Sequence, residues 1–319
     1  MKLTRINKKL IKTTKKSIDI YKEFGVQLAM YNFENSLFPD PRFKIGKRAH
    51  KKTHEYVQRR MEKEFQSVIN NYENMQINNN DVIGNKSPIW IFWWQGLDNA
   101  PKLVQRCIMS VKENALDHPV KIVTRDNYKK LVDIPDYIID KITNNKITLT
   151  HFSDILRMSL LYTYGGIWMD ATLFITKAIP INISNYSFYT IKHNLYADYH
   201  VCQGKWSGFF IAMSKENPLA KFCRDFFFEY WKKYDSLICY LLIDDIISLA
   251  YTHFKWAKKL IDDVPVNNRN VFELQSKLNN EYNTDTLDEL EKNTFVFKLS
   301  YKMHITVNNG TFSRKLGLV

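Results

Sequence analysis

The sequence contains little glycine, proline or cysteine. Only 10 Gly and 9 Pro occur among 319 residues, so no Gly- or Pro-rich spacer divides the chain. The four cysteines are widely spaced and none forms a CxxC pair, so the pattern indicates neither a zinc site nor a disulfide framework. We therefore expect a protein of the reducing cytoplasm.

Long apolar segments are missing as well. The chain has no run of about 18 apolar residues that would span a bilayer. Its first residues, MKLTRINKKLIKTTKK, lack the apolar stretch that a secretory signal needs. These absences predict a soluble or peripheral protein.

Several common functional motifs are also absent. There is no GxxxxGK(S/T) or GxGxxG loop, and no Ser-His-Asp or Cys-His nucleophile set is indicated. These absences argue against the common kinase, dehydrogenase and hydrolase mechanisms. No RRM, KH or zinc-finger signature is present, so we expect no nucleic-acid partner.

Positive charge is abundant and lies mainly near the amino terminus. Residues 1–66 carry 17 Lys and Arg against 7 Asp and Glu, whereas the remaining residues carry 29 against 26. Such a basic segment attracts an acidic partner. We interpret residues 1–80 as a basic helical region and residues 81–319 as the main domain.

Within the basic region, apolar residues at helical spacings predict an amphipathic helix from Thr4 to about Met30, with Gly25 as a point where it can break. A second helical segment is expected from about His50 to Met75. Basic amphipathic helices bind anionic membrane surfaces, which here would be the inner face of the cell membrane. The alternative is that the apolar stripe packs onto the main domain.

The main domain alternates strands and helices. The apolar run from Pro88 to Trp94 predicts a buried strand, and a helical pattern follows it. A second strand is expected at Val120–Thr124, with a helical stretch from Asp126. This alternation predicts an α/β fold with a mainly parallel sheet.

The segment HFSDILRMSLLYTYGGIWMDATLFITK is the most informative part of the sequence. It predicts a helix capped by Thr150 or Ser153 and ended by two glycines, then a short strand that ends at Asp170. Ligands of open α/β sheets bind at the carboxyl ends of strands, so Asp170 is a candidate functional carboxylate. Asp154 and Arg157 share one helix face, where they either hold a polar ligand or form a local ion pair.

Three motifs, IWIFWWQG, HFSDILR and YGGIWMDAT, resemble those of the capsular polysaccharide synthesis glycosyltransferases. That family is related to the DXD sugar transferases and, more distantly, to the clostridial glucosylating toxins. The resemblance implies a Rossmann-like GT-A fold and a UDP-sugar donor. It assigns Asp154 and Arg157 to the ribose and donor sugar, and Asp170 to the end of the DXD strand. The uracil pocket would comprise Trp93, Trp94, Gln95 and Gly96.

The resemblance also implies a Mn²⁺ or Mg²⁺ ion, but the motif departs from the usual pattern. Relatives end it with a second carboxylate, whereas this chain has Thr172, a weak neutral ligand. We expect Asp170, Thr172 and His304 to hold the metal, with His304 or Lys302 compensating for the missing acid near the diphosphate.

The resemblance implies transfer of a hexose from a UDP-sugar to a saccharide acceptor with retention of configuration. We expect the acceptor to be lipid-linked. Asp170, Asp244 and Arg157 are the expected catalytic residues. Asp244 is chosen over Asp245 by resemblance alone, since the apolar spacing of that helix does not separate them. The alternatives are a sugar-phosphate transferase or hydrolase of the same fold, and a membrane-surface scaffold with a decayed nucleotide site.

Overall fold

The protein is seen here as a computed structural model that describes residues 17–18, 20–38, 43–77, 81–195, 199–306 and 308–319. Most of the predicted helix from Thr4 to Met30 therefore lies outside the described residues or at their edge. Residues 17–18 and 20–24 are helical, and Gly25, with φ at 87°, separates them from the next helix, α2 (Val26–Leu37). The break expected at Gly25 is confirmed.

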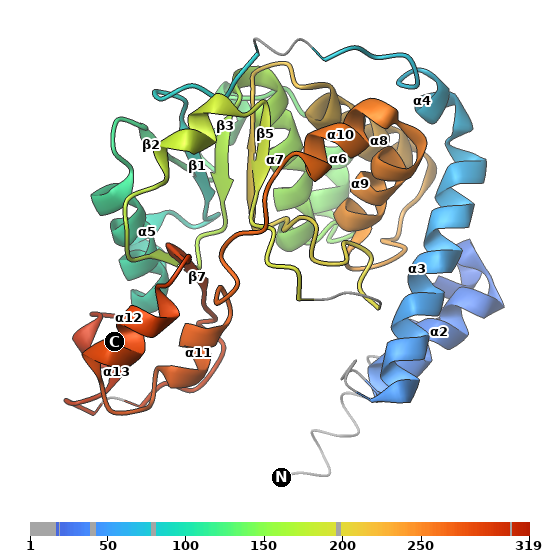
Figure 1. Ribbon diagram of the computed structural model, residues 1–319. Coiled ribbons are helices and arrows are strands. Elements are labelled where there is room, and N and C mark those ends of the chain that lie inside the picture. Colours follow the sequence, from blue (N-terminus) through green and yellow to red (C-terminus); the bar gives the residue numbers. More distant parts are fainter. Residues whose placement is uncertain (1–16, 19, 39–42, 78–80, 196–198, 307) are drawn as a thin grey trace.

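A five-stranded sheet lies at the centre of the molecule (Figure 1). β1 pairs in parallel with β2 and β3, while β6 runs antiparallel to its neighbours β3 and β5, so four strands point in one direction. The predicted α/β fold with a mainly parallel, GT-A-like sheet is therefore confirmed. In spatial order the strands are β2 (Val120–Val123), β1 (Ile89–Phe92), β3 (Gly166–Met169), β6 (Phe210–Met213) and β5 (Phe188–Thr190).

A second, two-stranded sheet pairs β4 (Leu173–Ile175) with β7 (Val296–Lys298) in antiparallel register. β4 follows β3 closely in the chain, whereas β7 comes from the carboxyl-terminal region. A separate small apolar core, which includes Phe174 and Phe297, fixes this pair against α5 (Lys102–Asn114) and the last helices. This sheet therefore carries a distant segment to the carboxyl end of β3.

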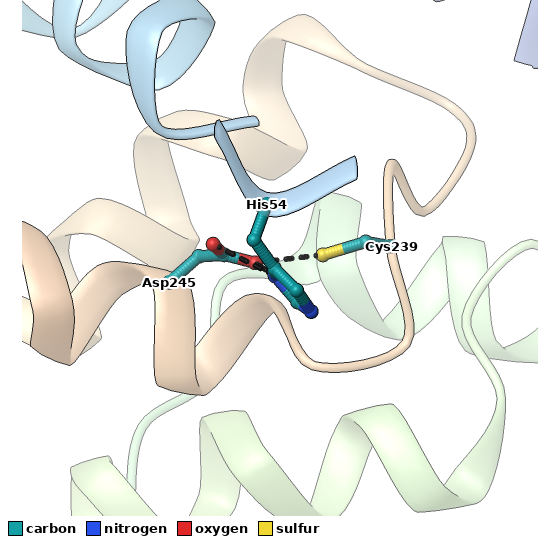
Figure 2. A group of neighbouring side chains, drawn as sticks. All are labelled: His54, Cys239 and Asp245. Atoms are coloured by element: carbon teal, nitrogen blue, oxygen red, sulfur yellow. Dashed lines mark hydrogen bonds and ion pairs between the residues drawn. The ribbon is translucent and has the colours of Figure 1, made fainter. Parts of the chain in front are cut away.

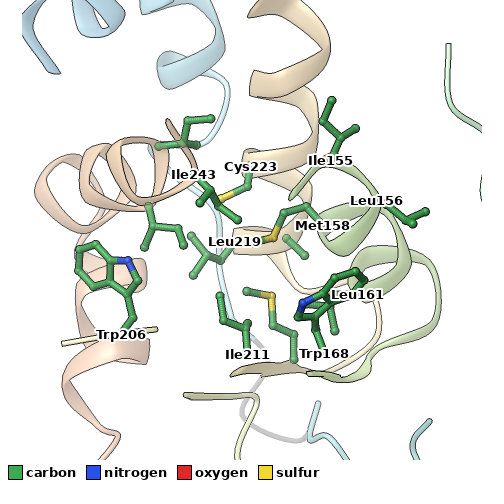
Figure 3. Packing of buried hydrophobic residues seen from close by; sticks show 14 of the residues in the cluster. Ile155, Leu156, Met158, Leu161, Trp168, Trp206, Ile211, Leu219, Cys223 and Ile243 are labelled. Carbon is green, nitrogen blue, oxygen red and sulfur yellow. The ribbon is translucent and has the colours of Figure 1, made fainter. Parts of the chain in front are cut away.

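Helix α7 (Leu149–Tyr164) leads directly into β3 and packs against α8 (Pro218–Lys233). Its side chains interdigitate with those of β3, β6, α8 and α9 (Leu242–His253), as Figure 3 shows. The helix begins earlier than predicted, because Thr148 rather than Thr150 or Ser153 is the cap and accepts a hydrogen bond from the backbone N–H of His151.

The two glycines that end α7 are required by space as well as by backbone angle. A Cβ at Gly165 would lie 2.6 Å from the backbone nitrogen of Lys215, and one at Gly166 would lie 2.2 Å from the carbonyl oxygen of Pro88. Both residues also have positive φ, at 66° and 104°. Close approach of the chain at this turn lets β3 enter the sheet beside β1.

The basic amino-terminal region packs onto the main domain. Helix α3 (Lys44–Glu64) contacts α2 and α9, and lies on the outer side of the helical layer in Figure 1. Its Val57 and Met61 are fully buried in the same core as the central sheet. The described part of this region thus follows the packed alternative, while the division at residue 80 stays a prediction.

The remaining helices complete these layers. The predicted helix from Asp126 is wrong, since only a short 3₁₀ turn forms at Tyr128–Lys130 before α6. The segment predicted over 50–75 is α3 followed by α4. The elements not yet given are α4 (Gln66–Asn70), α6 (Asp136–Thr143), α10 (Lys255–Asp262), α11 (Glu273–Lys277), α12 (Thr284–Leu290) and α13 (Phe312–Lys315).

None of the helices in the described part of the chain is both long and apolar enough to cross a membrane.

Candidate functional site

A cavity of about 350 Å³ lies beyond the carboxyl end of β3. Asp170 follows that strand directly, and its backbone N–H donates to the carbonyl of Phe209, which precedes β6. The volume falls within the roughly 300–1,000 Å³ of small-molecule pockets. The charged side chains that line it include Asp154 and Arg157 from α7, Asp170, Asp244 from α9 and Lys298 from β7.

Both carboxylate oxygens of Asp170 are engaged by donors. Oδ2 lies 2.6 Å from Nζ of Lys298, and Oδ1 lies 3.3 Å from Nη2 of Arg157 and accepts from the indole of Trp168 at 3.1 Å. Burial raises the pKa of Asp170, but Lys298 and Arg157 together outweigh it and hold the pKa below its ordinary value. Asp170 is therefore ionised at neutral pH.

Lys298 is the site residue that sequence reasoning missed. Its ammonium also donates to Oγ1 of Thr172 at 2.9 Å, so it bridges the first and last residues of the Asp-Ala-Thr motif. Pairing of β7 with β4 brings it there, because Lys298 is in register with Leu173. It lies in the same short segment, KLSYKMH, as Lys302 and His304, and the signal for it in the sequence is a basic residue at the end of an apolar run.

The predicted metal residues are not gathered around one point in the described part of the chain. Thr172 and Asp170 share the ammonium of Lys298, whereas His304 and Lys302 are exposed and do not line the cavity. Among the described residues, the one group of three or more His, Cys, Asp or Glu close enough to share an ion does not include Asp170. These residues do not fit the implied Mn²⁺ or Mg²⁺, which stays a prediction with no chemical step assigned to it.

Arg157 links α7 to the end of β3. Its Nη1 donates to Oδ1 of Asp154 at 2.7 Å, and its guanidinium lies over the ring of Trp168, 4.9 Å from the centroid. Both members of the pair are buried, where an unpaired charge would be costly. The local ion pair therefore exists, and the same arginine also contacts Asp170 inside the cavity.

Asp244 and Asp245 face different surroundings. Asp244 lines the cavity and accepts a hydrogen bond from the indole of Trp206 at 2.8 Å. Burial raises its pKa to about 7, against the opposing effect of the Trp206 hydrogen bond. Asp245 is instead paired with His54 of α3. The geometry thus brings Asp244, and not Asp245, to the cavity with Asp170 and Arg157.

The predicted uracil residues lie at the end of β1, the parallel neighbour of β3. They do not line the 350 Å³ cavity. Trp93 is half-buried, its indole N–H has no hydrogen-bond partner among the described residues, and the ring of Tyr301 meets it edge-on at 5.7 Å. Trp94 packs on Phe152, while Gln95 is exposed and Gly96 has φ at 81°. These residues occupy the same edge of the sheet as Asp170.

Comparison with known proteins finds two glycosyltransferases that are similar to part of this chain. The O-glycosyltransferase braB of Annulohypoxylon truncatum is 31% identical over 100 residues, covering 28% of this chain and 24% of that protein. The glycosyltransferase afumC of Aspergillus fumigatus is 28% identical over 100 residues, covering 28% of this chain and 26% of that protein. The matched region thus spans about a quarter of the length of these relatives. No solved structure matches the chain significantly.

The family described as "Capsular polysaccharide synthesis protein" matches residues 40–316, which is most of the sequence and includes every residue of the cavity. The chain therefore belongs to the capsular polysaccharide synthesis protein family.

Proposed function

We propose that the protein is a glycosyltransferase that moves a hexose from a UDP-sugar to a saccharide acceptor. The observation that carries this proposal is the convergence of Lys298 and Arg157 on Asp170 in one cavity at the carboxyl end of β3. Positioned cations stabilise the charge that develops on a diphosphate leaving group. The family and the names of the two relatives support the same class of reaction.

In this reaction the bond between the anomeric carbon and a phosphate oxygen breaks, and UDP leaves with the electron pair of that bond. The anomeric carbon bonds to the acceptor hydroxyl oxygen, and the hydroxyl proton passes to the departing UDP or to solvent. Lys298 is held by Asp170 and Thr172 before the donor arrives, so its ammonium needs little reorganisation to pair with the diphosphate. Arg157, fixed by Asp154, orients the donor sugar.

Asp244 is assigned to the sugar hydroxyls of the donor or the acceptor. With a pKa near 7 it exists in both protonation states at neutral pH, so it can donate as well as accept a hydrogen bond.

Trp93 and Trp94 are assigned to the uracil, since indole faces stack on bases. Retention of anomeric configuration is part of the proposal, on the family resemblance.

The first test is thermal denaturation of the full chain with UDP, other nucleotides and UDP-hexoses, each with and without Mn²⁺. A ligand that binds the folded state raises its apparent stability. We expect UDP and at least one UDP-hexose to stabilise the protein. No response to any nucleotide would contradict the proposal and favour a non-enzymatic scaffold.

Product analysis then separates the reaction classes. Release of UDP that requires a saccharide acceptor is expected for a glycosyltransferase. Release of UMP would instead indicate a sugar-phosphate transferase, and UDP release without any acceptor would indicate hydrolysis. NMR of the product reports the anomeric configuration, and inversion would overturn that part of the proposal.

We further propose that the protein acts at the inner, cytoplasmic face of a membrane on a lipid-linked acceptor. An exposed apolar surface formed by Ile18, Tyr21, Val26, Met30 and Phe33 lines a shallow hollow on α2 and the preceding helical residues. Exposed basic residues of α3 lie on the helix packed beside it. Apolar and basic side chains together suit an anionic lipid surface. These basic residues are Lys44, Arg48, Lys51 and Lys52.

Vesicle binding tests this second proposal. Deleting residues 1–66 is unsuitable because α3 contributes Val57 and Met61 to the core. We therefore choose the double substitution Val26→Ser and Met30→Ser, which changes two exposed side chains. It should weaken binding to phosphatidylglycerol vesicles, whereas the exposed Met109→Ser on α5 should not. Unchanged binding by the double variant, or no binding by the wild type, would contradict the proposal.

A further inference from the structure

A second cluster of reactive side chains lies outside the proposed donor site. His54 comes from α3, Asp245 from α9, and Cys239 from the loop that precedes α9, and all three are buried (Figure 2). Nδ1 of His54 lies 2.9 and 3.1 Å from the two carboxylate oxygens of Asp245, and Sγ of Cys239 lies 3.0 Å from Oδ2. Segments 191 residues apart in the chain thus present three different ligand atoms to one point.

We propose that His54, Cys239 and Asp245 bind a zinc ion. Thiolate, imidazole and carboxylate are the ligands that Zn²⁺ takes in proteins, whereas Ca²⁺ and Mg²⁺ take mainly oxygen. A thiolate and a carboxylate neutralise the two positive charges, so the buried site carries no net charge. This site does not depend on the proposed transfer reaction.

The distances between the ligand atoms suit such an ion. Zinc bonds of about 2.0–2.3 Å in tetrahedral geometry separate neighbouring ligand atoms by roughly 3.3–3.6 Å. The observed separations from Asp245 are 2.9–3.1 Å, and all three ligand atoms lie within 4.8 Å of one another. Shifts of less than about 1 Å would therefore admit the ion. Gln58 also donates to Asp245 at 2.8 Å, which holds the carboxylate in place as outer-shell partners do at zinc sites.

A fourth ligand is available on one side of the cluster. His50 precedes His54 by one turn of α3, with ring centroids 4.8 Å apart. Two histidines spaced i, i+4 on one helix face commonly bind one metal ion. His50, His54 and Cys239 also line a cavity of about 410 Å³, through which a water or an ion can reach the cluster. His50 or a water molecule from this cavity completes the four-coordinate site.

The position of the cluster gives the ion a structural role. Tyr240 and Leu241, which follow Cys239, line both this cavity and the proposed donor cavity. Asp244 is adjacent to Asp245 at the start of α9. An ion held by these three residues would join α3, the Cys239 loop and α9, and thereby fix the wall of the donor cavity that carries Asp244.

The test uses tag-free, full-length protein purified without chelator. We expect about one zinc per chain by elemental analysis, and a rise in melting temperature when zinc chloride is added back to chelator-treated protein. Cobalt chloride in place of zinc should give the charge-transfer absorption of a cobalt–thiolate bond. These wild-type measurements do not require any variant to fold.

Variants then locate the site. Cys239→Ser and His54→Gln should lose the zinc and the cobalt–thiolate absorption, whereas Cys223→Ser, at a buried cysteine of α8 outside the cluster, should keep both. Wild-type protein that contains no zinc, and neither gains stability with zinc nor absorbs with cobalt, would show that the cluster is only a hydrogen-bonded network. Unchanged cobalt absorption in Cys239→Ser would likewise overturn the assignment.

Discussion

Replacing Lys298 with methionine tests the proposed donor site most directly. Methionine keeps much of the length of the side chain and removes the charge that lies 2.6 Å from Asp170 and 2.9 Å from Thr172. A hydrogen bond to a charged group contributes about 1.5–3 kcal/mol. The Lys298 side chain is 25% exposed, so solvent screens part of its charge and the lower half of that range applies. The expected loss is about 10- to 40-fold in UDP affinity, at about 1.4 kcal/mol per tenfold.

Calorimetric titration of UDP into the wild type and the variant measures this loss. Lys302→Met is the matched control, since Lys302 is exposed and does not line the cavity, and it should bind UDP as the wild type does. Lys298→Arg should recover part of the affinity by restoring the charge. UDP affinity within about twofold of wild type in Lys298→Met would refute the role of Lys298, given that a single charged contact contributes at least about 1.5 kcal/mol. A large gain in affinity with Mn²⁺ would favour the predicted metal instead.

Three further predictions concern the same region. Asp170→Asn should reduce transfer at least about 100-fold, because Lys298 loses the carboxylate that positions it. The variant should stay folded, because Arg157 keeps its partner Asp154; near-normal turnover would contradict the site. The free energy of unfolding should fall as pH rises from about 4 to about 7, because the folded state holds the Asp244 proton that the unfolded state releases. In denaturant titrations, Asp244→Asn should flatten this dependence of the unfolding free energy on pH. An unchanged dependence would show that other titrating groups cause it. Gly166→Ala should destabilise the fold by about 3 kcal/mol or more. Gly310→Ala should have little effect, because a Cβ there would lie 3.9 Å from its nearest neighbour, Cγ of Glu281. Equal melting temperatures for the Gly166 and Gly310 variants would contradict the steric reasoning.

Features that depend on neighbouring residues were predictable from the sequence. The apolar run after Pro88 forms β1, the two glycines end α7, and Asp170 lies where β3 ends. Each follows from local backbone preferences or from the periodicity of apolar side chains. The family motifs lie in the same short segments, which is why membership was recognisable. Helix starts were less well predicted, since several polar residues near His151 were suitable caps and tertiary packing selected Thr148.

Contacts between distant segments were decided by the tertiary structure alone. Lys298 and Asp170 are 128 residues apart, and His54 and Asp245 are 191 residues apart. No spacing rule links such pairs, because their meeting depends on how β7 pairs with β4 and how α3 packs on α9. The same packing separates Asp244 from Asp245, which are adjacent in the chain but face opposite partners. Local preferences in the sequence were enough to place the strand end that carries Asp170. The charges that surround Asp170 depend on packing, since ion pairs form between side chains that folding brings within a few ångströms.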